Sequence, residues 1–302
     1  MLKAREHNMT LNQAVLFTKP VHHLQLDLGP DQLDRLAREY FEGKGLSIVY
    51  SKRVSGPELA VREIIRQHYL MYSKASYGDI GITPEGESAF AGHFGSDWDV
   101  EVEGGRILGN PDLMESKGID AHQLFELWIA SEVRKVQAGV LMGWLESLDC
   151  YCINAFYPAM EANFYHPDTL IDYYVVEFDP AQVSWQRFRK EVLGATNAAK
   201  AARGSFREQL YSQYKVEFPG RDNFVHGSAG PFEGMIERSI HETDFDLATN
   251  PVGRYLETLD VTLARIKEWK ERQSIAKLGA LFDATEEKDT SDIYPILDAV
   301  AW

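Results

Sequence analysis

The stretch Asn223-Phe-Val-His-Gly-Ser228 gathers side chains that could take part in nucleophilic chemistry. Its imidazole, His226, lies three residues after a carboxamide and two residues before a hydroxyl. A neutral imidazole is a nucleophile near neutral pH, because its unperturbed pKa is about 6.5. A carboxylate on one ring nitrogen would fix the tautomer and leave the other nitrogen able to attack. A segment rich in Glu follows and contains Glu237. A lone histidine is more often structural than catalytic, so its role depends on the residues around it.

Several side chains could hold phosphate groups, although the loops that usually bind phosphate are missing from the sequence. No GxxxxGK(S/T) pattern is present, and no GxGxxG pattern follows an expected strand. Phosphate would therefore be bound by side chains, and arginine fits phosphate oxygens with two parallel hydrogen bonds. The candidates are Lys19, Arg189 or Lys190, Thr196, Arg203 and Arg207.

The composition is that of a soluble protein with a sizeable core. The chain has 302 residues, enough for one large domain or two ordinary ones, and 44% of them are apolar. The net charge of -15 argues against a general nucleic-acid binder and against binding to an anionic membrane surface. Residues 1–13 contain no apolar leader, and no apolar run approaches the roughly 18 residues of a membrane helix. We therefore expect a cytoplasmic protein in which Cys150 and Cys152 are reduced and buried.

The first part of the chain predicts alternating strands and helices. An apolar run over 13–18 is typical of a buried strand, which Lys19-Pro20 ends. Apolar residues three and four apart predict a helix over 30–42, and alternation predicts a strand over 46–50. A second helix is expected over 56–72.

Residues 74–152 predict a separate unit whose sequence indicates no chemistry. Acids alternate with apolar residues over 97–108, which predicts a hairpin whose acids either bind a cation or form a solvated face. Asp120 could cap a long helix, with Gln123 three residues on and an apolar stripe that continues to Trp144. We interpret the whole segment as an insert or lid.

The rest of the chain predicts one strong strand and several helices. The strand is expected over 171–178, and helices over 182–192, 231–241 and 252–270. The charged segment 283–292 is expected to be mobile.

Four short signals occur in an order that resembles the nucleoside diphosphate kinase family. They are Phe17-Thr-Lys-Pro20, His68-Tyr69, Leu193-Gly-Ala-Thr-Asn197 and Asn223-Phe-Val-His-Gly-Ser228. Phe41-Glu-Gly-Lys-Gly-Leu46 and Ser205-Phe-Arg207 are also similar. The resemblance covers about 11–73 and 153–242. The N-x-x-H-G-S signature is fairly specific, whereas K-P and H-Y carry little information alone.

The resemblance implies an α+β fold, a ferredoxin-like sandwich with a four-stranded antiparallel sheet and helices on one face. It divides the chain into a first kinase-like part (1–73), the insert (74–152), a second kinase-like part (153–245) and a C-terminal helical extension and tail (246–302). The insert would enter beside the nucleotide site as a lid, as a restriction on the substrate, or in place of the family's usual oligomer contacts. A homo-oligomer is also implied.

The implied activity is reversible transfer of the γ-phosphate from a nucleoside triphosphate to a nucleoside diphosphate, with Mg²⁺ on the phosphates. The family's mechanism is ping-pong and passes through a phosphohistidine. His226 would be the nucleophile, and Glu237 would orient its ring with help from Ser228. Glu233 is the alternative to Glu237 if the alignment shifts.

Further roles carry over from the family by position. Lys19 would contact the ribose hydroxyls and a phosphate, and Asn223 would contact the ribose. Tyr69 would support the phosphate end near the nucleophile. Phe156 would stack on the base, and stacking tolerates different bases.

The terminal phosphates would be held by Thr196 and Arg207, while the family's second phosphate arginine falls at Lys190, with Arg189 beside it. Val21-His22 stands where the family has Asp-Gly after the lysine and proline, and Ala229 stands where it has Asp. These departures leave a second class of function open, a nucleotide-binding regulatory or scaffold protein on the same fold with weak or lost catalysis.

Overall fold

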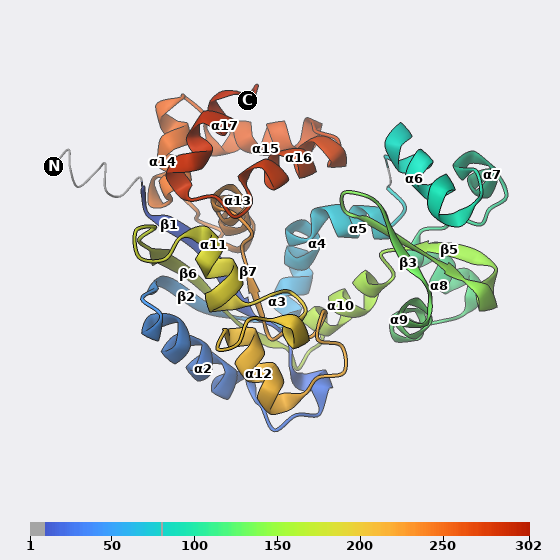
Figure 1. Cartoon of the computed structure of the whole chain (residues 1–302), viewed down its shortest axis with the longest axis horizontal. Helices are drawn as coiled ribbons and strands as arrows, with labels where there is room; N and C mark the ends of the chain where they lie inside the picture. Colours follow the sequence, from blue (N-terminus) through green and yellow to red (C-terminus); the bar gives the residue numbers. More distant parts are fainter. Residues whose placement is uncertain (1–9, 80) are drawn as a thin grey trace. The chain divides into compact units, whose positions relative to one another are not determined.

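The computed structural model describes residues 10–79 and 81–302, which divide into two compact units (Figure 1). The first unit comprises Met1–Arg62, Phe164–Arg272 and Leu281–Trp302, and the second comprises Glu63–Asn163 and Gln273–Ala280. The expected lack of a leader concerns residues 1–13, of which 1–9 lie outside the described residues. No helix in the described part of the chain is both long and apolar enough to span a bilayer.

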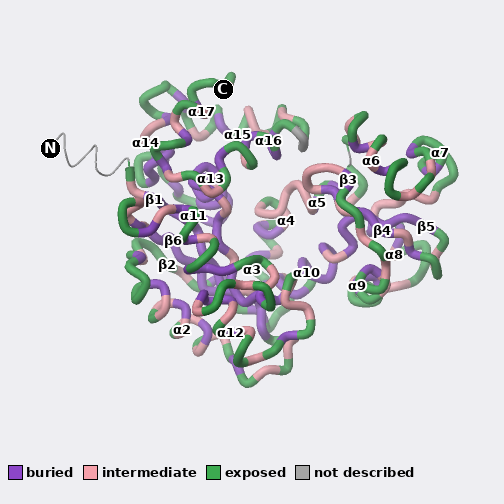
Figure 2. The backbone as a smooth tube through the Cα atoms, viewed as in Figure 1, coloured by how far each residue is buried: buried purple, intermediate pink, exposed green. Residues whose placement is uncertain are grey.

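An antiparallel sheet forms the centre of the first unit. Its strands are β1 (Asn12–Thr18), β2 (Ser47–Ser55), β6 (Leu170–Phe178) and β7 (Val225–Gly227), in the order β2-β6-β1-β7. All three neighbouring pairs are antiparallel. Every residue of β1 is buried, and Figure 2 shows the buried colour continuing along this part of the chain. A strand buried on both faces needs a cover on each side of the sheet.

Helices cover both faces of this sheet. Neighbouring residues of a strand point to opposite sides, so their contacts show what covers each face. Leu16 and Tyr174 belong to one apolar cluster, with side chains of α2 (Pro30–Gly43) and α12 (Phe206–Tyr214). Phe17 points to the other face and contacts His241 of α13 (Pro231–His241). The expectation of helices on a single face is therefore wrong for this chain. The fold is mixed α/β with an antiparallel sheet.

The remaining helices of the first unit are short. They are the 3-10 helix η1 (His22–Leu24), α3 (Gly56–Val61), α11 (Trp185–Arg187), the π-helix η3 (Phe188–Leu193), η4 (Ala198–Lys200), η5 (Leu247–Thr249), α14 (Pro251–Thr258), α15 (Leu263–Arg272), η6 (Thr290–Ile293) and α17 (Tyr294–Asp298). Two further helices belong to both units, α10 (Phe156–Tyr165) and α16 (Ile275–Thr285).

The second unit combines helices with a small antiparallel sheet. The strands are β3 (Val133–Gln137), β4 (Val140–Leu145) and β5 (Cys150–Ile153), in that order. The helices are α4 (Ile64–His68), α5 (Leu70–Ser76), α6 (Pro84–Phe94), α7 (Trp98–Glu103), α8 (Asn110–Lys117), α9 (Ala121–Ala130) and η2 (Glu146–Leu148). Phe90, Trp98 and Tyr151 lie in its apolar core. Cys150 and Cys152 are free thiols and buried, as expected.

Two expectations for this unit are wrong. The segment 97–108 contains helix α7 rather than a hairpin, because Asp97 caps the helix and accepts the N–H of Asp99 at 3.0 Å. The long helix after Asp120 begins with the expected capping box but ends at Ala130. Its apolar stripe continues in β3 and β4, where β-branched valines favour strands.

Three expectations elsewhere also need correction. The helix expected over 56–72 is divided among α3, α4 and α5, and the helix over 252–270 is divided into α14 and α15. The segment 283–292 is not a mobile tail. The side-chain oxygen of Asn12 accepts the buried N–H of Thr290 at 2.8 Å, and the Asn12 amide donates to Asp289 at 2.7 Å. Contacts with a residue 277 positions away fix this segment.

Candidate active site

His226 lies on β7, with its ring stacked on Phe17 of β1. The two residues are opposite each other in the antiparallel pair, which brings both side chains to one face of the sheet. The ring centroids are 4.6 Å apart and the planes differ by 16°. Phe17 also contacts His241 at 5.3 Å, and His241 stacks on Tyr173 at 4.8 Å. These packed rings restrict the plane of the His226 imidazole.

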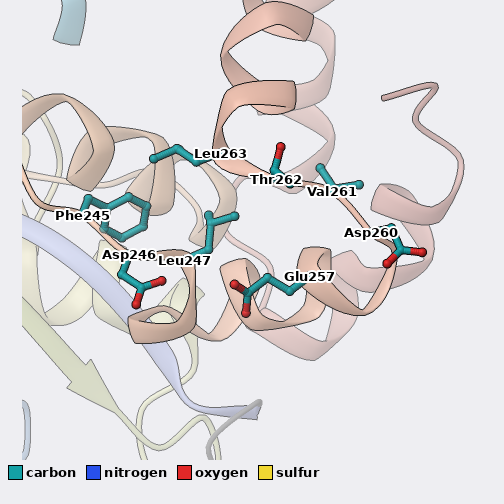
Figure 3. A pocket seen from close by; sticks show the side chains of 8 residues that line it. All are labelled: Phe245, Asp246, Leu247, Glu257, Asp260, Val261, Thr262 and Leu263. Carbon is teal, nitrogen blue, oxygen red and sulfur yellow. The ribbon is translucent and has the colours of Figure 1, made fainter.

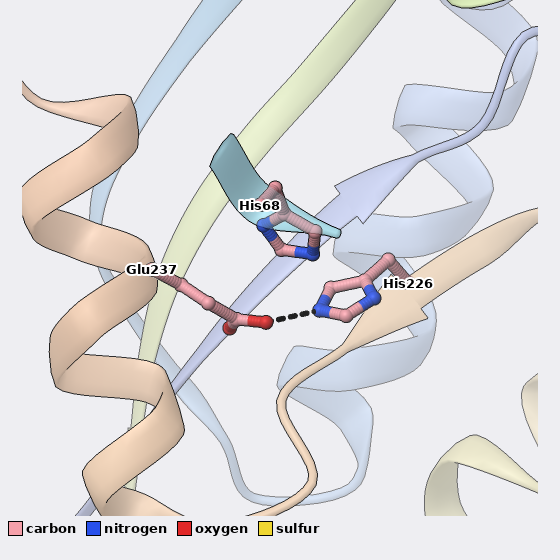
Figure 4. Close-up of side chains that lie close together, drawn as sticks. All are labelled: His68, His226 and Glu237. Atoms are coloured by element: carbon pink, nitrogen blue, oxygen red, sulfur yellow. Dashed lines mark hydrogen bonds and ion pairs between the residues drawn. The ribbon is translucent and has the colours of Figure 1, made fainter. Parts of the chain in front are cut away.

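The Glu237 carboxylate, itself held by Ser228, determines which nitrogen of His226 carries the proton. Nε2 of His226 lies 2.7 Å from one carboxylate oxygen of Glu237 (Figure 4). The Ser228 hydroxyl donates to the other oxygen at 2.5 Å. The Glu237 side chain is only 4% exposed. Because a carboxylate accepts hydrogen bonds, Nε2 carries the proton and Nδ1 carries the lone pair.

The surroundings keep the His226 ring neutral. Burial is the main cause that holds the pKa of His226 well below its ordinary value, and the positive charges of Lys19, Arg207 and Arg189 lower it further. A neutral imidazole with a fixed tautomer, placed among cations, can act as a nucleophile toward an anionic group at neutral pH.

Lys19 follows β1 directly and belongs to the same cationic cluster. Its backbone N–H donates to Phe224 at 2.8 Å, and its ammonium donates to the carbonyl of Arg221 at 3.0 Å. Burial and then the charge of Arg207 lower the pKa of Lys19 to about 7, although Asp222 acts in the opposite direction. Lys19 therefore titrates near neutrality.

Arg207 is buried at the beginning of α12 and holds two segments of backbone together. Its Nη1 donates to the carbonyl of Gly194 at 2.8 Å, and its Nη2 donates to that of Val225 at 2.9 Å. The guanidinium thereby connects the turn before Thr196 to the strand of His226. From this position its charge acts on both His226 and Lys19.

The neighbouring cations Arg189 and Lys190 lie in different surroundings. Arg189 donates from Nη1 to the carbonyl of Gly227 at 3.0 Å, and its side chain is 18% exposed. Lys190 is 59% exposed and pairs with Glu287 at 3.4 Å. Neighbouring residues of a helix point in different directions, and in the π-helix η3 the side chain of Arg189 is the one that reaches Gly227.

Asn223 connects the loop of Thr196 to the histidine strand. Its Nδ2 donates to the carbonyl of Thr196 at 2.7 Å, while its Oδ1 is buried and has no hydrogen-bond partner among the described residues. The Thr196 side chain is exposed. Since buried polar atoms are nearly always bonded, Oδ1 of Asn223 is suited to accept a hydrogen bond from a ligand hydroxyl.

Tyr69 and Phe156 belong to the second unit. Tyr69 follows α4, and its ring contacts that of His68 at 4.6 Å. Phe156 begins α10 and contacts Tyr72 at 5.6 Å and Trp128 at 6.2 Å. Within its own unit Phe156 is therefore part of an aromatic cluster and is only partly buried.

Two residues of the site have roles that the sequence did not indicate. Phe17 was quoted as part of a motif, but its stacking on His226 depends on strand register, which the sequence leaves open. Glu233 accepts the backbone N–H of Ala229, and burial, followed by the charge of Glu237, raises its pKa to about 8. Glu237, rather than Glu233, makes the hydrogen bond to the His226 ring.

A pocket of about 480 Å³ lies in the C-terminal part of the first unit and contains none of these residues (Figure 3). Apolar and acidic side chains line it together, and Asp246, Glu257 and Asp260 supply the acids. Among the described residues that line it, none carries a positive charge that could bind a phosphate group.

No protein-family model matches the chain, and no curated protein sequence matches it significantly. Similar solved structures include a nucleoside-diphosphate kinase from Borrelia burgdorferi with bound vanadate and ADP. The two sequences are 15% identical, the match covers 78% of this chain and 89% of that chain, and the TM-score is 0.35. A second is an NDP kinase from Pyrobaculum aerophilum, with 16% identity, 78% of this chain and 97% of that chain covered, and a TM-score of 0.36. A third is the nucleoside diphosphate kinase from Aquifex aeolicus, with 14% identity, 78% of this chain and 96% of that chain covered, and a TM-score of 0.32. At this distance, the case for a function depends on the side chains of the site.

Proposed function

We propose that this chain is a nucleoside diphosphate kinase-like phosphotransferase that forms a phosphohistidine at His226. The hydrogen bond between Nε2 of His226 and Glu237 is the observation that carries the proposal. It places the lone pair on Nδ1 of a neutral ring, and Lys19, Arg189 and Arg207 surround that ring with positive charge. A core histidine without a chemical role would not need three cations, which raise the free energy of its own protonated form.

The first half-reaction is a transfer between nitrogen and oxygen. The lone pair of Nδ1 attacks the γ-phosphorus of a nucleoside triphosphate, and the bond from that phosphorus to the β–γ bridging oxygen breaks. The nucleoside diphosphate leaves with the electron pair of that bond. Glu237 stabilises the positive charge that develops on the ring through the Nε2 proton. In the second half-reaction the terminal oxygen of another diphosphate attacks the phosphoryl group, and Nδ1 takes back its electron pair.

Positioning and charge neutralisation supply most of the catalysis in such transfers. Lys19 and Arg189 bind phosphate oxygens, Thr196 offers a hydroxyl to the terminal phosphates, and Asn223 accepts a ribose hydroxyl through Oδ1. Arg207 contributes its charge and keeps the Thr196 turn beside β7. Mg²⁺, when bound, neutralises phosphate charge. The cationic residues that surround His226 fit an ion that arrives on the nucleotide rather than one held by the protein.

The finer features of the fold belong to the same proposal. The strand order β2-β6-β1-β7 fits a ferredoxin-like sheet, into which residues 74–152 are inserted. Phe156 stacks on the base and Tyr69 supports the phosphate end. Residues 246–302 extend the family's domain, and the active form is a homo-oligomer.

One observation favours the alternative, a nucleotide-binding regulatory or scaffold protein with weak or lost catalysis. Arg207 donates to two backbone carbonyls from within the core, instead of presenting its guanidinium to solvent. A phosphate contact from Arg207 would have to compete with those hydrogen bonds. Weak transfer with intact nucleotide binding would fit this alternative.

The variant His226→Ala separates the two functions. We expect it to reduce transfer from ATP to GDP by roughly 10⁴-fold or more, because the proposed nucleophile is removed. Nucleotide affinity should change by less than about threefold, since Lys19 and Arg189 remain. The measurements are a steady-state transfer assay and calorimetric titration with ADP. Unchanged transfer in the variant would refute the role of His226, and negligible transfer by the native protein despite binding would favour the alternative.

A further inference from the structure

We propose that the C-terminal segment 285–290 is an autoinhibitory element, in which the carboxylate of Glu286 lies beside the phosphate-binding edge of Arg189 and opposes an anionic ligand there. This inference rests on the proposed function, because it concerns regulation of the same site. Residues 246–302 have no counterpart in the family that the sequence resembles, so the segment is a feature of this chain.

Arg189 offers an edge of its guanidinium that no described residue fills. Nη1 is anchored to the carbonyl of Gly227 at 3.0 Å. Nε is buried and has no hydrogen-bond partner among the described residues, and Nη2 lies 3.9 Å from a carboxylate oxygen of Glu286, beyond hydrogen-bond distance. Nε and Nη2 together form the edge that binds two oxygens of one phosphate in parallel. A buried donor without an acceptor costs free energy, which a phosphate oxygen would recover.

The segment lies against the residues that follow His226. The N–H of Glu287 donates to the carbonyl of Ala229 at 2.9 Å. The carbonyl oxygen of Thr285 approaches Gly230 so closely that a Cβ there would lie 2.6 Å from it. On the far side, Asp289 accepts the N–H of Trp185 at 2.6 Å. A backbone hydrogen bond at one end and the Asp289 side chain at the other therefore hold the two glutamates beside the π-helix.

The two glutamates face the two adjacent cations. Glu286 faces Arg189 at 3.9 Å, and Glu287 faces Lys190 at 3.4 Å. Their side chains are 44% and 31% exposed, so they can rotate into solvent while the backbone stays in place. A phosphate bound at the edge of Arg189 would lie close to the Glu286 carboxylate, and the two negative charges would repel each other. Binding of nucleotide therefore requires the Glu286 side chain to rotate away from Arg189.

Equilibrium binding of inorganic tripolyphosphate and of ADP tests this competition without requiring catalysis. Glu286→Gln keeps the shape of the side chain and removes its charge. We expect it to lower the Kd of both probes by about three- to tenfold at low salt, and by less at high salt. Glu268→Gln is the matched control, because Glu268 is 60% exposed and pairs with Arg272 in α15. It changes the net charge equally and should alter the Kd by less than about twofold.

The same measurement in an Arg189→Gln background shows whether the effect passes through Arg189. There, Glu286→Gln should have no further effect on the Kd. If native protein binds both probes and Glu286→Gln binds them equally well, the autoinhibitory role is overturned while the proposed function stands. Equal tightening by Glu286→Gln and Glu268→Gln would reduce the effect to net charge and also overturn it. Binding by none of the proteins would overturn both proposals.

Discussion

At the scale of single residues, the site combines a fixed tautomer with unusual charge states. Glu237 accepts from Nε2 of His226, and the nearby cations disfavour protonation of the ring. Burial, and then the charge of Arg207, lower the pKa of Lys19 to about 7. Like charges confined in one place raise the free energy of the empty site and favour an anionic ligand.

Lys19 should therefore take up a proton when nucleotide binds. At pH 8 its ammonium is mostly deprotonated in the free protein, since the pKa is about 7. A bound phosphate would raise that pKa and draw in close to one proton per site, whereas at pH 6 Lys19 is already charged and uptake should vanish. Titration calorimetry with ADP in buffers of different ionisation enthalpy measures the number of protons taken up per site. Lys19→Met should abolish the uptake at pH 8, and an enthalpy independent of buffer in the native protein would contradict the assignment.

At the scale of elements, the π-helix η3 presents two adjacent cations in different surroundings. By spacing alone, Lys190 matches the family's phosphate arginine. Within η3, however, Arg189 donates to the carbonyl of Gly227, whereas Lys190 is largely exposed. We therefore expect Arg189, rather than Lys190, to bind phosphate.

Arg189→Lys should weaken nucleotide binding much more than Lys190→Ala. Loss of the two-pronged contact should raise the Kd for ADP by roughly 10- to 100-fold, because a charged hydrogen bond contributes about 1.5–3 kcal/mol. Lys190→Ala should raise it by less than about threefold, as expected for an exposed pair. Both values come from the same calorimetric titration. The reverse order of effects would show that Lys190 is the phosphate ligand.

At the scale of the whole molecule, the sequence predicted the elements whose pattern is local. The spacing of His226, Ser228 and Glu237 indicated residues that the structure brings into hydrogen-bond contact. Helices over 30–42 and 231–241 are confirmed by α2 and α13, whose apolar faces repeat clearly.

What the sequence could not predict depends on non-local contacts or on ambiguous periods. Valines three and four apart continue the apolar stripe of α9, although Val136 and Val140 lie in strands. In 97–108 the alternation of acidic and apolar residues did not correspond to a buried strand face. Val100 and Val102 lie in α7 and are 55% and 47% exposed. The charged segment after α16 is ordered by Asn12, from the other end of the chain. Arg189 could not be distinguished from Lys190 without the helical phase.

The central claim is a covalent phosphoryl group on His226. Incubation with γ-labelled ATP and Mg²⁺, followed by treatment of the isolated protein with acid and with base, tests it most directly. We predict a label that is stable in base and lost in acid, that GDP removes as GTP, and that is missing from His226→Ala. A label that survives acid, or one that persists in His226→Ala, would contradict the account.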